Sequence, residues 1–164
     1  MSDEASKAMM AADDFALPAF VTFLSLGQHA RFARRVGLAR GKYKVDVPET
    51  TGDPGFVRVF RAHQNSMEFY PLALTSMWVS SVYFHPVPAS LAGLVYIYGR
   101  QSYFDGYAES SAARLPGFML SLNAVLLLMG MSGVGVTAAL LRRYADLDLA
   151  AMAKGFVEGI LKKD

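Results

Sequence analysis

The chain has 164 residues, of which 53% are hydrophobic and 18% are charged, and its mean hydropathy is +0.26. The length predicts one domain, and this composition is unusual for a soluble protein but typical of a membrane protein. The net charge of +2 is too small to indicate binding to nucleic acid. Because there is no cysteine, disulfides and protein thiolates are excluded, and any thiol chemistry must come from a substrate.

The N-terminal part predicts a leader, one helix and a loop. Segment 1–14 is polar and mildly acidic, and we interpret it as a disordered leader. The first helix begins with the apolar stretch Phe15–Leu26 and continues into a basic region with His29, Arg31, Arg34 and Arg35, whose role the sequence does not assign. The basic C-terminal end of this helix must therefore contact water or protein rather than lipid. Gly41–Gly55 is rich in proline and glycine and predicts a solvent loop.

Three more helices follow. The second runs from about Phe56 to His85, and Pro71 within it predicts a kink. The third runs from about Ala89 to Ser110. The fourth, Pro116–Leu141, has about 25 residues without any charge, which is long enough to cross the hydrocarbon of a bilayer and makes it the clearest membrane span.

These segments predict an all-α membrane protein whose membrane domain, residues 15–141, is a four-transmembrane-helix bundle. Residues 142–164 are charged and amphipathic. We expect them to form a helical tail outside the membrane.

Arg61, Asn65 and Glu68 lie at positions i, i+4 and i+7, so these polar side chains share one helix face inside apolar sequence. Charged groups in a membrane span are costly unless they face a protein partner, a cavity or a ligand. This face is therefore a candidate functional site.

A second polar face lies on the third helix, where four residues fall within about 40° of one direction: Tyr96, Arg100, Tyr103 and Tyr107. Phenol groups can donate hydrogen bonds to an anionic ligand, and Arg100 can pair with a carboxylate such as Glu68 or a substrate carboxyl. An aromatic belt at the membrane interface explains the spacing equally well. The presence of two polar faces favours a site.

Four blocks of sequence carry a specific pattern: Phe56–Asn65, Glu68–Pro71, Gly93–Arg100 and Tyr103–Tyr107. They combine an Arg-Ala-x-x-Asn-x-x-Glu run with a tyrosine-rich helix. Over roughly Ala39 to Leu141 the chain resembles the membrane-associated eicosanoid and glutathione metabolism (MAPEG) family. The resemblance implies a homotrimer in the endoplasmic reticulum or nuclear envelope, with glutathione as co-substrate, no metal, and one glutathione bound at each subunit interface.

The resemblance also implies which residues bind glutathione. Glu68 would bind the γ-glutamyl ammonium, and Arg61 a carboxylate. His63 points about 200° away from Arg61 on its helix, so it would serve the neighbouring subunit's pocket. The full set of matching positions is Arg40, Arg61, His63, Asn65, Glu68, Tyr103 and Tyr107, with support expected from Lys42, Tyr96 and Arg100.

Arg114 matches the family arginine that activates the thiol. A glutathione thiol with a pKa like that of free cysteine, about 8.5, is only slightly ionised at neutral pH, and the thiolate is the nucleophile. A guanidinium stays charged and can stabilise it. The expected reaction is thiolate addition to a lipophilic electrophile, including leukotriene synthesis, or reduction of a lipid hydroperoxide.

Three positions depart from the leukotriene-forming members of the family. Gly41 replaces a second arginine near the thiol, Phe69 replaces a tyrosine, and Leu126 replaces the aromatic residue that caps the lipid tail. These departures favour a broader transferase over strict leukotriene specificity.

Two other function classes stay open. One is a non-catalytic lipid-binding member of the same family, like the arachidonate-presenting 5-lipoxygenase-activating protein, although Arg61 and Arg114 count against it. The other is a small channel or transporter that uses charged residues inside the membrane. A metal site is not expected, because His29 and His85 have no second ligand at a suitable spacing.

Overall fold

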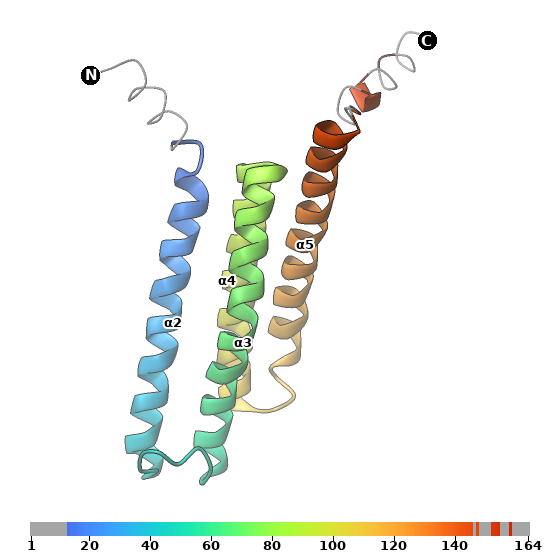
Figure 1. Cartoon of the computed structure of the whole chain (residues 1–164). Coiled ribbons are helices and arrows are strands. Elements are labelled where there is room, and N and C mark those ends of the chain that lie inside the picture. Colours follow the sequence, from blue (N-terminus) through green and yellow to red (C-terminus); the bar gives the residue numbers. More distant parts are fainter. Residues whose placement is uncertain (1–12, 146, 148–151, 155–157, 159–164) are drawn as a thin grey trace, which may run out of the picture.

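The computed structural model describes residues 13–145, 147, 152–154 and 158. In this part of the chain the regular structure is helical, with four long helices side by side (Figure 1). They are α2 (Ala16–Tyr43), α3 (Pro54–Tyr83), α4 (Pro86–Glu109) and α5 (Leu115–Tyr144). The all-α prediction is therefore confirmed for the described residues. Most of the expected leader lies outside the described residues, which include only its positions 13 and 14. Of the expected tail, Arg142–Tyr144 continue α5, and positions 145, 147, 152–154 and 158 are also described.

Local chemistry explains where the helices begin and end. Lys44 adopts a left-handed conformation, with φ of 55°, and ends α2. The Asp53 carboxylate accepts a hydrogen bond from the Gly55 backbone N–H at 2.7 Å and caps α3, whose first residue is Pro54. His85 caps α4 in the same way, accepting from the Val87 N–H at 3.2 Å. The helix ends therefore fall within a few residues of those predicted.

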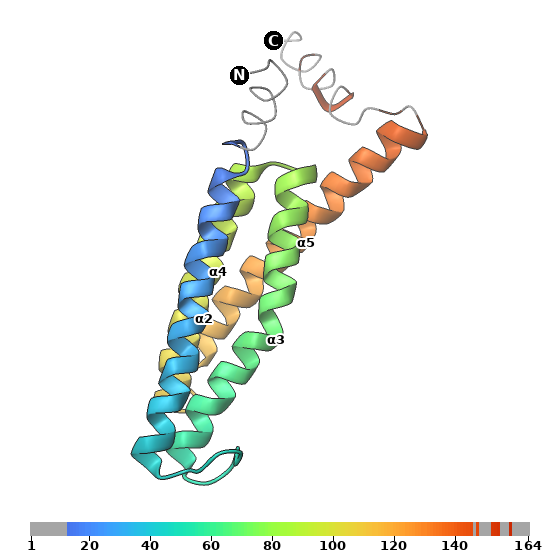
Figure 2. The ribbon, with the colours of Figure 1, turned by 60° about the vertical axis from the view of Figure 1, so that its left-hand side comes forward.

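Pro71 lies inside α3. Figure 2 shows that α3 changes direction about half way along its length, as expected of a proline within a helix. The lower half of α3, Pro54 to about Pro71, is the part that carries the candidate site residues.

Helices α4 and α5 approach closely where glycines leave room. A Cβ added at Gly117 would lie 2.1 Å from the backbone N of Tyr103, and one added at Gly99 would lie 2.8 Å from the backbone N of Ser121. These distances are too short for any side chain, so both positions require glycine. The contact at Gly117 places the beginning of α5 directly against Tyr103 of α4.

An ion pair links α2 to α4. The Arg35 guanidinium donates to the Asp105 carboxylate and lies 4.4 Å from the centroid of the Phe104 ring. Beneath it, Phe32 stacks on Phe104 with ring centroids 4.1 Å apart, and both rings are fully buried. Arg35, one of the basic residues to which the sequence analysis assigned no role, therefore links α2 to α4.

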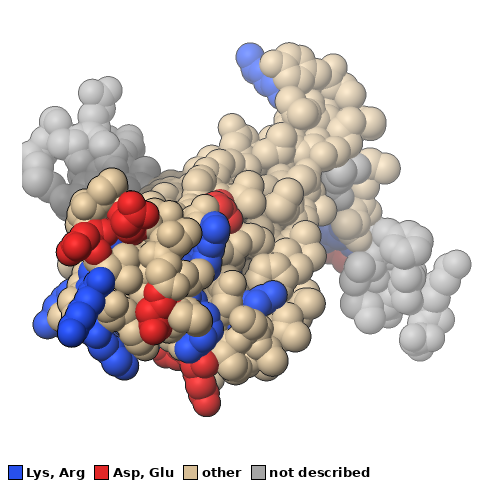
Figure 3. Space-filling model, turned by 90° about the horizontal axis from the view of Figure 1, so that it is seen from below, with Lys and Arg blue, Asp and Glu red and all other residues tan. Residues whose placement is uncertain are grey.

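Large apolar side chains are exposed on the outside of all four helices, including Phe23 of α2, Leu72 of α3, Leu91 of α4 and Leu127 of α5. Among the described residues, only α5 is long and apolar enough to cross a membrane by length and composition. The four-span arrangement and the homotrimer stay predictions. Charged side chains gather at the lower end of the bundle, where the α2–α3 loop lies (Figure 3).

Candidate functional site

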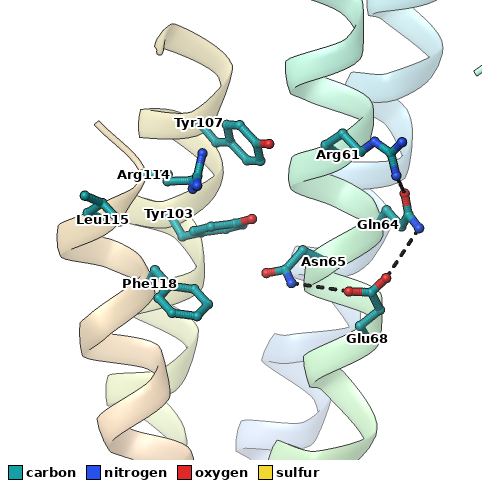
Figure 4. A pocket seen from close by; sticks show the side chains of 9 residues that line it. All are labelled: Arg61, Gln64, Asn65, Glu68, Tyr103, Tyr107, Arg114, Leu115 and Phe118. Carbon is teal, nitrogen blue, oxygen red and sulfur yellow. Dashed lines mark hydrogen bonds between the residues drawn. The ribbon is translucent and has the colours of Figure 1, made fainter. Parts of the chain in front are cut away.

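A hollow of about 310 Å³ lies between the lower half of α3, the end of α4 and the beginning of α5 (Figure 4). Polar side chains face one another across it, and two apolar side chains complete the α5 side. The lining residues are Arg61, Gln64, Asn65, Glu68, Tyr103, Tyr107, Arg114, Leu115 and Phe118. The structure therefore brings together six of the residues predicted from the sequence: Arg61, Asn65, Glu68, Tyr103, Tyr107 and Arg114.

The α3 wall is a continuous chain of hydrogen bonds. Arg61 Nη1 donates to Gln64 Oε1 at 2.8 Å, and Gln64 Nε2 donates to one Glu68 oxygen, Oε1, at 3.3 Å. Asn65 Nδ2 donates to the other, Oε2, at 3.3 Å. Arg61 and Glu68 are both exposed, so a cation and a carboxylate are presented to the hollow at fixed places.

Behind this wall, Arg100 of α4 is completely buried. Its Nη2 donates to Asn65 Oδ1 and to Ser66 Oγ, each at 3.0 Å, and its Nη1 lies 3.4 Å from Ser121 Oγ. The guanidinium also lies 4.2 Å from the centroid of the Tyr103 ring. These neutral partners accept hydrogen bonds from both Nη atoms of the guanidinium, and the ring adds a cation–π contact. A cation buried without such partners would be very costly.

The sequence analysis expected Arg100 to pair with a carboxylate such as Glu68 or a substrate carboxyl. Instead, Asn65 stands between Arg100 and Glu68, and Arg100 does not line the hollow. The reason is geometric: Arg100 points from α4 toward Ser66 and Ser121, inside the bundle, whereas Glu68 points out from α3. Arg100 therefore supports the α3 wall from within.

The opposite wall carries aromatic rings and a second cation. Tyr103 and Tyr107 meet edge to face with ring centroids 5.7 Å apart. Arg114, the residue directly before α5, lies with its guanidinium carbon 4.9 Å from the centroid of the Tyr107 ring. Figure 4 shows Arg114 beside Tyr107 and Tyr103, across the hollow from Arg61 and Glu68. Among the described residues, no carboxylate forms an ion pair with Arg114.

The remaining predicted residues lie elsewhere in the single chain. Arg40 donates to the backbone oxygens of Asp46 and Glu49, at 3.1 and 2.7 Å, and so holds the α2–α3 loop. Lys42 is exposed above the Tyr43 ring, and His63 is half-buried and does not line the hollow. Tyr96 is buried in the core, with no hydrogen-bond partner for its hydroxyl among the described residues. That His63 serves a neighbouring subunit stays a prediction.

Three lining residues were missed by the sequence analysis: Gln64, Leu115 and Phe118. Gln64 could have been found, since it lies three residues after Arg61 and four before Glu68 and therefore on the same helix face. Leu115 and Phe118 carry no polar signal. Also, no cluster of metal-ligating side chains occurs within the described ranges.

Comparison with known proteins identifies the family. The model of the MAPEG family matches residues 18–134, which is most of the chain. The chain belongs to the MAPEG family. The MAPEG resemblance seen in the sequence is thereby confirmed, and so is association with a membrane, for which the family is named.

Individual MAPEG proteins match over nearly their whole length. The chain is 48% identical to microsomal glutathione S-transferase 2 of Homo sapiens over 134 residues, covering 82% of this chain and 91% of the relative. It is 45% identical to the Bos taurus protein of the same name, covering 85% and 96%. Leukotriene C4 synthase of Cavia porcellus is 43% identical over 145 residues, covering 88% and 97%.

Proposed function

We propose that this protein is a membrane glutathione S-transferase that binds glutathione in the hollow between α3, α4 and α5. The observation that carries the proposal is the placement of charge: one carboxylate, Glu68, and two cations, Arg61 and Arg114, face the same space. The relatives named glutathione S-transferase support the choice of ligand.

Glutathione has a matching set of groups. It carries one ammonium, two carboxylates and one thiol. Glu68 can accept hydrogen bonds from the ammonium, and Arg61 can donate two hydrogen bonds to a carboxylate. The hydroxyls of Tyr103 and Tyr107 can donate to the peptide carbonyls. Leu115 and Phe118 give the α5 side an apolar surface next to the lipid-facing part of the helix, which suits a lipophilic second substrate.

Arg114 is the residue that we assign to activation of the glutathione thiol. Among the described residues it is the one cation on the α5 side of the hollow. Its charge stabilises a thiolate relative to the thiol and so raises the concentration of the nucleophile. The thiolate sulfur then forms a bond to an electrophilic carbon. With an epoxide, the carbon–oxygen bond breaks and the alkoxide takes up the proton that the thiol released.

The same thiolate can reduce a lipid hydroperoxide, in which case two glutathione molecules become one disulfide while the hydroperoxide becomes an alcohol and water. We include this peroxidase reaction, and leukotriene C4 synthesis, as candidate activities. Leukotriene C4 synthesis is favoured by the similarity to leukotriene C4 synthase. The departures at Gly41, Phe69 and Leu126 favour a broader range of electrophiles.

We further propose that the working form is a homotrimer in the endoplasmic reticulum or nuclear envelope. The hollow is open in the single chain, and Arg40, Lys42 and His63 lie outside it. A neighbouring subunit could bring such residues to its rim, so assembly would complete the site. Native mass spectrometry in detergent tests this point, since an active monomer would contradict it.

Ligand-induced stabilisation distinguishes the proposal from its rivals. Millimolar glutathione should raise the melting temperature of the detergent-solubilised protein, because a ligand that binds only the folded state stabilises it by mass action. The protein should also conjugate glutathione to a model aryl halide. A lipid-binding protein or a channel would show neither effect, and the absence of both would overturn the proposal.

A further inference from the structure

The Glu68 carboxylate is held by two amides, each of which is held in turn by an arginine. Gln64 donates to Oε1 and Asn65 to Oε2, both at 3.3 Å. Arg61 donates to the Gln64 oxygen at 2.8 Å, and Arg100 to the Asn65 oxygen at 3.0 Å. Two arginine–amide–carboxylate chains therefore converge on one side chain.

The chemistry of the partners decides the orientation of each amide. A guanidinium only donates hydrogen bonds, and an ionised carboxylate only accepts them. If the Gln64 amide were turned over, its oxygen would face Glu68 and its N–H groups would face Arg61, so both contacts would become repulsive. The amide can bridge the two charges in one orientation only, and each charge reinforces it.

The two chains differ in where they lie. Asn65 lines the hollow, but its arginine, Arg100, is buried inside the bundle and does not. In the other chain both Gln64 and its arginine, Arg61, line the hollow. We propose that Gln64 is a positioning residue for ligand binding: it holds the Glu68 carboxylate toward the ligand's ammonium. This inference rests on the proposed function of the hollow.

Holding Glu68 matters because the side chain is exposed and long. An unrestrained glutamate loses rotamer freedom when it binds a ligand, and this loss of conformational entropy weakens binding. Gln64 and Asn65 restrict the carboxylate before the ligand arrives, which reduces that loss. The two amides use about half of the four lone-pair sites of the carboxylate, so the others stay available for an ammonium.

The experiment is to replace Gln64 with methionine, which keeps the length of the side chain and removes the amide. We expect Gln64→Met to weaken glutathione binding about three- to tenfold by calorimetry, while kcat at saturating glutathione stays near wild type. The matched control is Gln101→Met on α4, which removes a hydrogen bond to Asp105 at 2.8 Å and does not line the hollow. Gln101→Met should leave glutathione affinity unchanged.

A double-mutant cycle separates positioning from general damage. If Gln64 acts through Glu68, Gln64→Met should have little further effect on glutathione binding in a Glu68→Gln background. It should likewise have little effect on a glutathione analogue that lacks the ammonium. Full additivity of the two substitutions, or equal weakening of the analogue, would overturn the inference.

The outcomes also separate this inference from the proposed function. If wild-type protein does not bind glutathione, the proposed function fails. If wild type binds glutathione and Gln64→Met binds it equally well, the function stands and the positioning role of Gln64 is wrong. Thermal unfolding of each variant in detergent verifies that the helices still assemble.

Discussion

The guanidinium carbon of Arg114 lies 4.9 Å from the centroid of the Tyr107 ring. This contact joins the residue before α5 to the last turns of α4. It holds the cation at the edge of the hollow without neutralising it, because an aromatic face attracts a guanidinium but carries no net charge. Among the described residues no carboxylate pairs with Arg114, so it is positioned and available to stabilise an anion.

Tyr107 should contribute in two separable ways. Tyr107→Phe keeps the ring and removes the hydroxyl, so it should weaken glutathione binding modestly and leave kcat nearly unchanged. Tyr107→Leu also removes the aromatic face, so kcat should fall a further two- to fivefold, equivalent to about 0.5 to 1 kcal/mol. Steady-state kinetics on both variants test this. Equal kcat for the two variants would show that the ring does not position Arg114.

Glu68→Gln should weaken glutathione binding by about 1.5 to 3 kcal/mol, because it removes the charge that pairs with the ammonium while nearly preserving the shape of the side chain. Calorimetry on assembled protein measures the change. Unchanged affinity would mean that Glu68 only completes the hydrogen-bond chain with Gln64 and Asn65.

Gly117→Ala should destabilise the protein by about 1 to 3 kcal/mol, since the new Cβ would meet the Tyr103 backbone at 2.1 Å. It should also lower activity, because α5 would be pushed away from α4 and would carry Arg114 with it. Gly130→Ala is the control, as no atom lies within 4 Å of a Cβ at that position. If thermal unfolding showed the two variants equally stable, the close contact at Gly117 would not be required.

Much of this architecture follows from local sequence signals. Asp53 with Pro54, and His85 with Pro86, set the beginnings of α3 and α4, so the helix ends were predictable. The shared face of Arg61 and Glu68 was also predictable from helical spacing. What spacing cannot reveal is which way a face points once the helices pack.

The second helix face shows this limit. Tyr96 and Arg100 have the same spacing as Tyr103 and Tyr107, yet of these four only Tyr103 and Tyr107 line the hollow. Tyr96 and Arg100 are buried away from it, and Tyr103, though also buried, lies at its wall. The hollow occupies one end of α4, so a face that extends over three turns runs from the site into the core. The packing of α3 and α5 against α4 alone decides at which residue this face passes from the site into the core.

The central claim is that Arg114 stabilises the thiolate of bound glutathione. The most direct test is a pH titration of the ultraviolet absorbance of the bound thiolate in wild type, Arg114→Ala and Arg114→Lys. We predict that the alanine variant binds glutathione within a few-fold of wild type but ionises it at a pH at least about one unit higher, equivalent to 1.4 kcal/mol. Lysine should restore only part of the shift, since it lacks the fork of donors. Ionisation at the same pH in wild type and Arg114→Ala would contradict the account.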